Sequence, residues 1–371
     1  MAKYKVAIIG STGRGDYGHG LDAVWQRFDD CEVVAVADPV EAGLVKALAR
    51  TGAARGYADY REMLDKEHPQ IVAVCPRWID QHRDMAIACA EHGCHMYMEK
   101  PFARTLGEAD EIIRACEMRH LKLAVAHISR YSPQLGLVKK LIASGEIGDI
   151  LEIRARGKED ARGGGEDLWV LGTHVLDLMR VYGGDPVSCY ATMRQSGLPV
   201  RPEHVRAGNE GLGPLAGDRI DAMYRFQSGV VGYFSSQRGA GGNPNRFGLR
   251  IYGSRGVIDH TSGYGNPAYL IADPHWSGPT SRAAWRTISS QGIDQPETLT
   301  ATGYEGGNPA AARDLIAAIE QDRPPLCSMT EARGAIEMVL GVFESHRVGG
   351  PVSLPLTVAG HPLEGGKSRG L

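Results

Sequence analysis

Residues 95–101 read His95-Met96-Tyr97-Met98-Glu99-Lys100-Pro101, an apolar run that ends in a charged pair and a proline. A proline disfavours helical geometry at the preceding residue, so the run is predicted to be a strand that stops at Lys100. Lys100 then projects from the carboxyl end of the strand, which is where open α/β sheets bind ligands. We expect a functional lysine here, and the alternative is a structural ion pair between Lys100 and Glu99.

Strand and helix patterns alternate around this segment from residue 1 to about residue 127. Short apolar runs that predict strands lie at 6–9, 33–37, 71–74, 95–98 and 121–126. Helical patterns separate them at 41–51, 81–92 and 106–120. Strands that are apolar throughout and joined by helices predict a doubly wound parallel sheet with helices on both faces.

The pattern changes from about Ser129 onward. Helices are predicted at 133–144 and 167–182, with a strand at 150–155 between them. Tight turns join the runs 219–226 and 230–235, and likewise 247–252 and 257–259, which predicts an antiparallel sheet. Two helices close the chain at 310–321 and 330–348, and Asn308-Pro309 is the expected cap and first residue of the earlier one.

Bulk composition indicates a soluble globular protein of two domains. The chain has 371 residues, 43% of them hydrophobic and 23% charged, and its net charge of −3 favours neither nucleic acid nor a membrane surface. Seven scattered cysteines without a CxxC spacing favour reduced thiols, a cytoplasmic location and no metal site. We expect no signal peptide and no membrane span.

The first predicted strand runs into a glycine-rich turn, Gly10-Ser11-Thr12-Gly13-Arg14-Gly15. Such a turn lets the backbone approach a pyrophosphate, and the N-terminus of the following helix favours the negative charge. Gly10 and Gly15 fit the spacing G-x-G-x-x-G, whereas Thr12 occupies the middle glycine position. A flexible loop without a ligand is the alternative interpretation.

An acidic residue, Asp38, ends the second predicted strand 23 residues after Gly15. At this position a carboxylate accepts the adenosine ribose hydroxyls and repels a 2′-phosphate. The turn, the spacing and the acid together predict a dinucleotide site that prefers NAD to NADP. Arg14 or Arg55 would soften that preference.

Further motifs follow in order along the whole chain. They are Cys75-Pro76 with His82, Glu99-Lys100-Pro101, Arg130-Tyr131-Ser132-Pro133, the segment 141–148, Gly172-Thr173-His174 with Asp177, Arg323-Pro324-Pro325 and the helix 331–345. Together with the turn 10–15 and Asp38, this set resembles the Gfo/Idh/MocA family of oxidoreductases.

The resemblance implies a Rossmann domain at 1–127 and an α+β domain at 128–371 with a large, mostly antiparallel open sheet, whose closing helices can pack back on the first domain. It implies NAD as cofactor, bound by the turn, Asp38, Cys75, Pro76, His82, Glu99 and Lys100. It also implies a sugar, sugar derivative or cyclitol as substrate, and a homodimer or homotetramer formed through the open sheet. His82 is equally well explained as a helix-surface residue.

Hydride transfer needs a base that removes the hydroxyl proton, and Lys100 is the first candidate. Burial and the positive charge of oxidised nicotinamide would lower its pKa toward neutrality. His174 lies in an otherwise apolar helix beside Gly172 and Thr173, and we expect it to relay the proton with Lys100. The alternative is a core histidine.

Inositol-type dehydrogenases of the family carry Asp four residues before this His, where the present chain has Val170. The nearest carboxylates are Asp177, at i+3, and Asp167, two turns back. Asp177 either orients His174 or caps a nearby loop.

Basic residues near the predicted strand 150–155 form a possible clamp for an anionic sugar. The candidate substrate residues are Lys100, Arg130, Arg156, Lys158, Arg162, Trp169 and His174. We prefer a solvated basic loop as the explanation of Arg156, Lys158 and Arg162, and core packing as the explanation of Trp169.

The leading hypothesis is a cytoplasmic NAD-dependent sugar or polyol dehydrogenase. The second is a glycoside hydrolase or lyase that recycles NAD by transient oxidation, elimination and re-reduction. A third is an NAD-binding regulator without turnover, which the presence of Lys100 and His174 disfavours.

Overall fold

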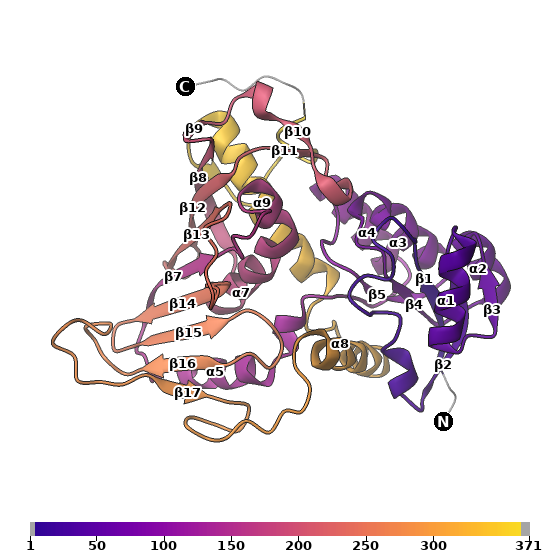
Figure 1. Cartoon of the computed structure of the whole chain (residues 1–371), viewed down its shortest axis with the longest axis horizontal. Coiled ribbons are helices and arrows are strands. Elements are labelled where there is room, and N and C mark those ends of the chain that lie inside the picture. The colour runs from indigo at the N-terminus through magenta and orange to yellow at the C-terminus, as the bar shows by residue number, and fades with distance from the viewer. Residues whose placement is uncertain (1–3, 365–371) are drawn as a thin grey trace. The chain divides into compact units, whose positions relative to one another are not determined.

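The computed structural model describes residues 4–364, which form two compact units (Figure 1). The first unit holds the described part of Met1–Ile128 together with Asn209–Gly213 and Tyr304–Arg333. The second holds Ser129–Gly208, Pro214–Gly303 and the described part of Gly334–Leu371. Two later segments of the chain thus belong to the N-terminal unit.

The first unit contains a six-stranded parallel sheet. Its strands are β1 (Tyr4–Ile9), β2 (Cys31–Ala37), β3 (Arg55–Tyr57), β4 (Ile71–Val74), β5 (His95–Met98) and β6 (Leu123–Val125). The spatial order is β3-β2-β1-β4-β5-β6, so the chain reverses direction across the sheet between β1 and β4. The predicted doubly wound parallel sheet is confirmed.

The helices of this sheet are α1 (Glu41–Thr51), α2 (Tyr60–Glu67), α3 (His82–Glu91) and α4 (Leu106–Glu117). β3 and α2 were not predicted from the sequence. β3 has only three residues and two of them are exposed, so it carries no apolar run. Asp59 begins α2 by accepting a hydrogen bond from the backbone N–H of Arg61, a capping signal that was present in the sequence.

The expected helix directly after the glycine-rich turn is wrong. Within the described residues, the chain between β1 and β2 forms turns and one 3-10 turn, Trp25–Arg27, but no α-helix. Gly13, Gly15, Gly18 and Gly20 all have positive φ, which interrupts right-handed helical geometry every two or three residues. Backbone groups and side chains of the turn must therefore provide the contacts to a negatively charged ligand that a helix N-terminus provides in other proteins.

The expected start of the helix at Asn308-Pro309 is also wrong, because α8 spans Gly303–Glu320 and Pro309 lies inside it. Proline lacks the N–H that would bond the carbonyl of Glu305, four residues earlier. Arg27 Nη1 donates to this carbonyl over 3.1 Å and replaces the missing donor. Asn308 is buried, where it accepts a hydrogen bond from Tyr97 Oη (2.8 Å) and donates one to the carbonyl of His19 (2.9 Å).

The second unit is built on a ten-stranded mixed sheet in the order β17-β16-β15-β14-β7-β13-β12-β8-β18, with β9 paired to β8. Its strands are β7 (Ile150–Arg156), β8 (Pro186–Gln195), β9 (Leu198–Pro199), β12 (Arg219–Phe226), β13 (Val231–Gln237), β14 (Gly248–Gly253), β15 (Val257–Thr261), β16 (Ala268–Ile271), β17 (Arg286–Ile288) and β18 (Val352–Ser353). Both predicted hairpins are present, and among the described strands of this sheet only β7 and β13 pair in parallel. A separate ribbon joins β10 (Arg206–Ala207) to β11 (Pro214–Leu215).

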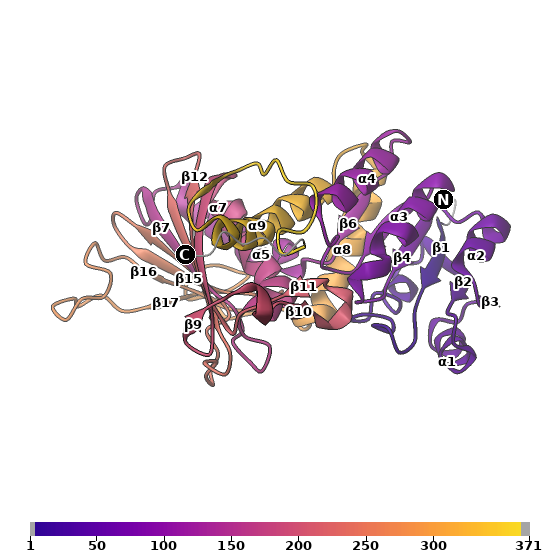
Figure 2. The same cartoon turned by 90° about the horizontal axis from the view of Figure 1, so that it is seen from above.

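Helices cover one face of this large sheet. They include α5 (Pro133–Ala143), α7 (Thr173–Gly183) and α9 (Met329–Val348), and Figure 2 shows α7 and α9 running along that face. Along β7, Ile153 and Ala155 are buried against the helices, whereas Arg154 is exposed on the opposite face. The alternation of strand residues therefore gives the sheet one apolar face and one charged, open face.

All seven cysteines are free and buried. Among residues 4–364, no helix has the length and apolar character that crossing a membrane requires.

Candidate cofactor and substrate site

Four strand ends meet at one edge of the first sheet. Ile9 of β1 pairs in register with Ala37 of β2 and with Val74 of β4, and Val74 pairs with Met98 of β5. The residues that follow these strands are therefore brought together: the glycine-rich turn, Asp38, Cys75-Pro76 and Glu99-Lys100. This edge includes the point between β1 and β4 where the strand order reverses, which is the usual ligand crevice of open α/β sheets.

Asp38 is 1% exposed and surrounded by hydrogen-bond donors. Thr12 Oγ1 (2.6 Å) and Tyr17 Oη (2.8 Å) donate to its Oδ2, and the N–H of Val40 donates to Oδ1 over 2.9 Å. The N–H of Thr12 lies 3.2 Å from both oxygens. The side chain is thus already an acceptor of hydroxyl groups.

The two arginines that would soften a preference for NAD are held elsewhere in the first unit. Arg14 forms an ion pair with Asp80, and its guanidinium lies 4.6 Å from the ring centroid of Trp78. Arg55 bonds both carboxylate oxygens of Glu67. Neither guanidinium pairs with Asp38.

The glycine-rich turn has two tightly packed glycines, Gly10 and Gly15, and one open glycine, Gly13. A Cβ on Gly15 would collide with the backbone nitrogens of Arg77 and Trp78, which follow β4. A Cβ on Gly13 would meet no atom within 4 Å, so the backbone is bare there. Bare backbone next to a hydroxyl-accepting carboxylate fits a dinucleotide, whose pyrophosphate needs close approach and whose ribose offers hydroxyls.

Glu99 connects this turn to Lys100. Its fully buried carboxylate accepts hydrogen bonds from the N–H of His19 (2.9 Å) and of Lys100 (2.8 Å), and it also pairs with Nδ1 of His19. Burial opposes ionisation, but the charges and hydrogen bonds of His19 and Lys100 outweigh it and lower the pKa of Glu99. The ring of His19 stacks on that of Tyr304, with centroids 4.3 Å apart.

His19, Tyr17, Tyr304 and Asn308 were not identified from the sequence. Of these residues, His19 alone could have been recognised as a candidate site residue, because core packing does not explain a histidine inside a glycine-rich turn.

His82 is fully buried, and both of its ring nitrogens face backbone carbonyls. Nδ1 lies 2.8 Å from the carbonyl oxygen of Pro101, and Nε2 lies 2.7 Å from that of Pro76. Burial lowers its pKa, although these carbonyls oppose the shift. His82 therefore joins the segments after β4 and β5, next to Cys75, a thiol whose pKa burial raises well above its usual range.

In the second unit, His174 lies in the first turn of α7, directly after a π-helical segment, Leu168–Gly172. The predicted helix 167–182 is thus interrupted: a short turn, α6 (Gly165–Asp167), precedes the π segment. A π turn adds a residue and rotates the helical residues after it, and such turns are common at functional sites. The ring of His174 is nearly buried and meets Phe247 edge-on, with centroids 6.3 Å apart.

The carboxylates near His174 have their own partners. Arg130 Nε donates to both oxygens of Asp177, over 2.7 and 2.9 Å, and Asp177 is fully buried. Asp167 accepts hydrogen bonds from Ser236 Oγ and from the N–H of Glu159 (3.1 Å), and burial raises its pKa. These hydrogen bonds hold the side chain of Arg130 against Asp177. They also connect Asp167 to β13 through Ser236 and to the loop after β7 through Glu159.

The basic residues after β7 are paired with acids. Arg156 and Arg246 both pair with the buried carboxylate of Glu159, and Arg162 donates to Asp160 over 2.6 Å. Lys158 Nζ lies 4.0 Å from the same Asp160.

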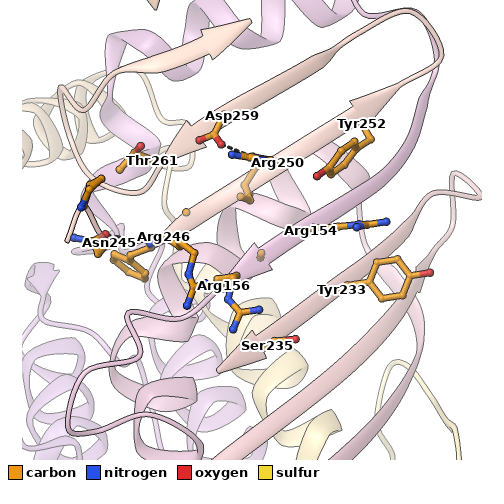
Figure 3. Close-up of a pocket in the computed structure, with 15 residues that line it drawn as sticks. Arg154, Arg156, Tyr233, Ser235, Asn245, Arg246, Arg250, Tyr252, Asp259 and Thr261 are labelled. Carbon is orange, nitrogen blue, oxygen red and sulfur yellow. Dashed lines mark hydrogen bonds and ion pairs between the residues drawn. The ribbon is translucent and has the colours of Figure 1, made fainter. Parts of the chain in front are cut away.

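A hollow of about 490 Å³ lies on the open face of the large sheet (Figure 3). Its side chains are mainly basic and aromatic, namely Arg154, Arg156, Tyr233, Arg246, Arg250 and Tyr252. The guanidinium of Arg154 lies 5.0 Å from the ring centroid of Tyr252. Arg156 belongs to this hollow, and it alternates along β7 with Ile153 and Ala155, which face the helices, so the hollow lies on the opposite face of the sheet.

Trp169 is fully buried in the π-helical segment. Its ring stacks on Phe343, with centroids 6.5 Å apart, and on His361, at 6.2 Å. The structure thus places Trp169 in the core of the second unit.

Two models of one family match successive parts of the chain. The model described as "Oxidoreductase family, NAD-binding Rossmann fold" matches residues 4–127, and "GFO/IDH/MocA C-terminal domain" matches residues 136–259. The fold also resembles a solved levoglucosan dehydrogenase in complex with NADH and levoglucosan. The TM-score is 0.76 at 23% identity, over 95% of this chain and 100% of that chain.

Curated relatives match at low identity. Levoglucosan dehydrogenase of Pseudarthrobacter phenanthrenivorans is 30% identical over 253 residues, which is 61% of this chain and 64% of that protein. Myo-inositol 2-dehydrogenase of Thermotoga maritima is 24% identical over 67% of this chain and 74% of its own length.

The register of the strand ends, the hydroxyl-accepting Asp38 and the matches of both domain models lead to one conclusion. The chain belongs to the GFO/IDH/MocA family of oxidoreductases, and its N-terminal part is that family's NAD-binding Rossmann domain.

Proposed function

We propose that the chain is a cytoplasmic NAD-dependent dehydrogenase that acts on a CH–OH carbon of a sugar, sugar derivative or cyclitol. One observation carries the proposal: Asp38, an acceptor of hydroxyl groups, and Lys100 follow strands whose ends are in register at the crevice edge of the sheet. The names of the relatives, levoglucosan and myo-inositol dehydrogenases, support the substrate class.

The residues of the first unit fit the cofactor. The bare backbone at Gly13 would face the pyrophosphate, with Ser11, Thr12 and Arg14 on either side, and Asp38 would hold the adenosine ribose. When bound, NAD supplies the acceptor for the hydride. Cys75, Pro76 and Glu99 would lie along the cofactor, whereas His82 would act through the two carbonyls that it holds.

Lys100 is proposed to take the proton of the substrate hydroxyl. Its backbone is held by Glu99 at the end of β5, and its side chain is largely buried at 5% exposure. A positioned amine that accepts this proton acts as a general base. His174 is proposed to pass the proton on, and Asp177 would set the electrostatics of α7 through its pair with Arg130.

A redox-neutral glycoside hydrolase or lyase that recycles NAD is the second candidate. It is favoured by the environment of His174, because Val170 replaces the expected acid while Asp167 and Asp177 are bound to Ser236 and Arg130. An anionic substrate would suit Lys158 and Arg162, which lie in the loop after β7.

One assay separates the two candidates. The protein is incubated with NAD and a panel of free sugars, cyclitols and aryl glycosides, while NADH absorbance and aglycone release are recorded together. Stoichiometric accumulation of NADH supports the dehydrogenase. Aglycone release without lasting NADH supports the hydrolase, and NAD binding without either reaction would contradict both.

We also propose that the open face of the large sheet joins copies of the chain into a homodimer or homotetramer. The aromatic and arginine side chains there are of the kinds enriched at protein interfaces. Light scattering of the wild type and of the variant Tyr233→Glu tests this proposal. A monomeric wild type would contradict it.

A further inference from the structure

The hydrogen-bonding capacity of Asp38 is already used by the protein. A carboxylate offers about four lone-pair positions. Thr12 and Tyr17 each place a hydroxyl on Oδ2, while the N–H of Val40 and, more weakly, that of Thr12 face Oδ1. Because Asp38 is also buried, a ribose cannot add its hydroxyls without displacing one of these donors.

Tyr17 is the donor whose removal would open the site. Its ring lies against Gly10, so closely that a Cβ on Gly10 would collide with it. Tyr17 therefore covers both the first glycine of the turn and the acid at the end of β2. Thr12, by contrast, holds Asp38 through its backbone as well as its side chain.

The surroundings of Tyr17 keep it a hydrogen-bond donor. Burial and the hydrogen bond to Asp38 raise the pKa of its phenol, so it stays protonated at neutral pH. Arg50 lies over the ring, 4.8 Å from its centroid. Gly15 and Gly18, on either side of Tyr17 in the sequence, have positive φ, and a Cβ on either would collide with neighbouring atoms, so the turn that presents the ring to Asp38 requires glycine at both positions.

We infer that Tyr17 determines the affinity for the cofactor by competing with the adenosine ribose for Asp38. The inference rests on the proposed function and adds a residue to it. A ribose hydroxyl takes the place of the phenol hydroxyl on Oδ2, so one donor is exchanged for another. The same movement uncovers Gly10. Ligands that contain an adenosine ribose must displace Tyr17, whereas nicotinamide mononucleotide need not.

The variant Tyr17→Phe tests this competition, because it keeps the ring and removes only the hydroxyl. Dissociation constants for NADH, ADP-ribose and nicotinamide mononucleotide are measured by calorimetry on the full chain. We expect NADH and ADP-ribose to bind about tenfold to a hundredfold more tightly, since a hydrogen bond to a charged group no longer has to be broken. Affinity for nicotinamide mononucleotide should not change.

Tyr57→Phe is the matched control. Tyr57 also donates a phenol hydrogen bond to a carboxylate, that of Glu67. Its contact with Asp38 is through the backbone carbonyl, which accepts from the Asp38 N–H over 2.9 Å and which the variant keeps. It should leave all three affinities unchanged. Tyr17→Met, which removes both ring and hydroxyl, should strengthen NADH binding at least as much as Tyr17→Phe, and it provides a second test if Tyr17→Phe is unstable.

Unchanged or weaker binding of NADH and ADP-ribose by Tyr17→Phe would overturn the inference and leave the proposed function intact. An equal gain for nicotinamide mononucleotide would also overturn it, because the effect would then be general. If neither the wild type nor the variants bound NADH, the proposed function would fail, and the inference with it.

Discussion

The strand-end edge of the first unit and helix α7 of the second hold their functional side chains in different ways. At the strand ends, Glu99 and His82 bind backbone groups, so the sheet itself fixes the geometry around Lys100. On α7, Asp177 is fixed by a side chain 47 residues away in the sequence, that of Arg130. We therefore expect substitution of Lys100 to disturb the fold less than substitution of Arg130 or Asp177.

The largest effect is expected at Lys100, where the first region meets the chemistry. Lys100→Met should lower the turnover number by about 10²-fold to 10⁴-fold, because a positioned general base contributes that much. The dissociation constant for NADH should change little, since the backbone bond from Lys100 to Glu99 remains. Stopped-flow turnover and NADH titration measure the two quantities.

Lys66→Met is the control for Lys100→Met, because Lys66 is exposed, where it pairs with Glu62 and lies 5.8 Å from the ring centroid of Tyr57. It should preserve turnover. Persistent turnover in Lys100→Met would remove Lys100 from the mechanism.

The second largest effect is expected at the buried pair of Arg130 and Asp177. Removing one partner leaves an uncompensated buried charge, so Arg130→Met or Asp177→Leu should each cost about 3–5 kcal/mol of unfolding free energy. The double variant should cost less than the sum of the single variants. Urea unfolding of all four proteins gives the coupling, and strictly additive losses would show that the pair does not hold α7 in the expected way.

The sequence predicted the first region better than the second. Parallel strands bring their carboxyl ends to the same edge of a sheet, so local patterns are enough to predict which residues meet there. Apolar runs that stop at Asp38 and at Lys100 identify the edge, and regular pairing then brings the two together. The start of the helix near Asn308 was wrongly predicted because it depends on a contact between segments far apart in the sequence. Asn-Pro is a common helix start, but Arg27, 278 residues before Glu305, supplies the donor that lets α8 begin earlier.

Side-chain partners from distant segments were not predictable in the candidate site. Nothing in the periodicity of the turn indicates that Tyr17 bonds Asp38, or that Ser236 bonds Asp167. The π-helical segment before His174 was also missed, since its apolar residues fit a regular helix equally well. Local patterns therefore predicted which residues are chemical candidates, but not how most of them are held.

An intermediate effect is expected in the first region when Asp38 is replaced, and it concerns the choice between NAD and NADP. Asp38→Ala should weaken NAD by about tenfold or more, because it removes the acceptor for the ribose hydroxyls, and should weaken NADP much less. It also leaves the hydroxyls of Thr12 and Tyr17 without their acceptor, so the melting temperature should fall as well. Both affinities are measured by calorimetry below the melting temperature, and equal losses for NAD and NADP would contradict the ribose contact.

The smallest effect is expected in the loop after β7, where a half-exposed ion pair responds to pH. Hydrogen bonds from Arg162 lower the pKa of Asp160 from its ordinary 3.8 to about 2. A depressed pKa stabilises the fold above the unfolded value, so this contribution is complete above about pH 4 and disappears as the pH falls through about 2.

Because the pair is partly exposed to solvent, Arg162→Gln should cost only about 0.2–1 kcal/mol at pH 7 and nothing near pH 2. Urea unfolding at the two pH values measures this. A loss of the same size at both pH values would mean that Arg162 stabilises the loop by packing rather than by charge. Contacts between side chains would then stabilise the second unit in this water-exposed loop as well as around α7.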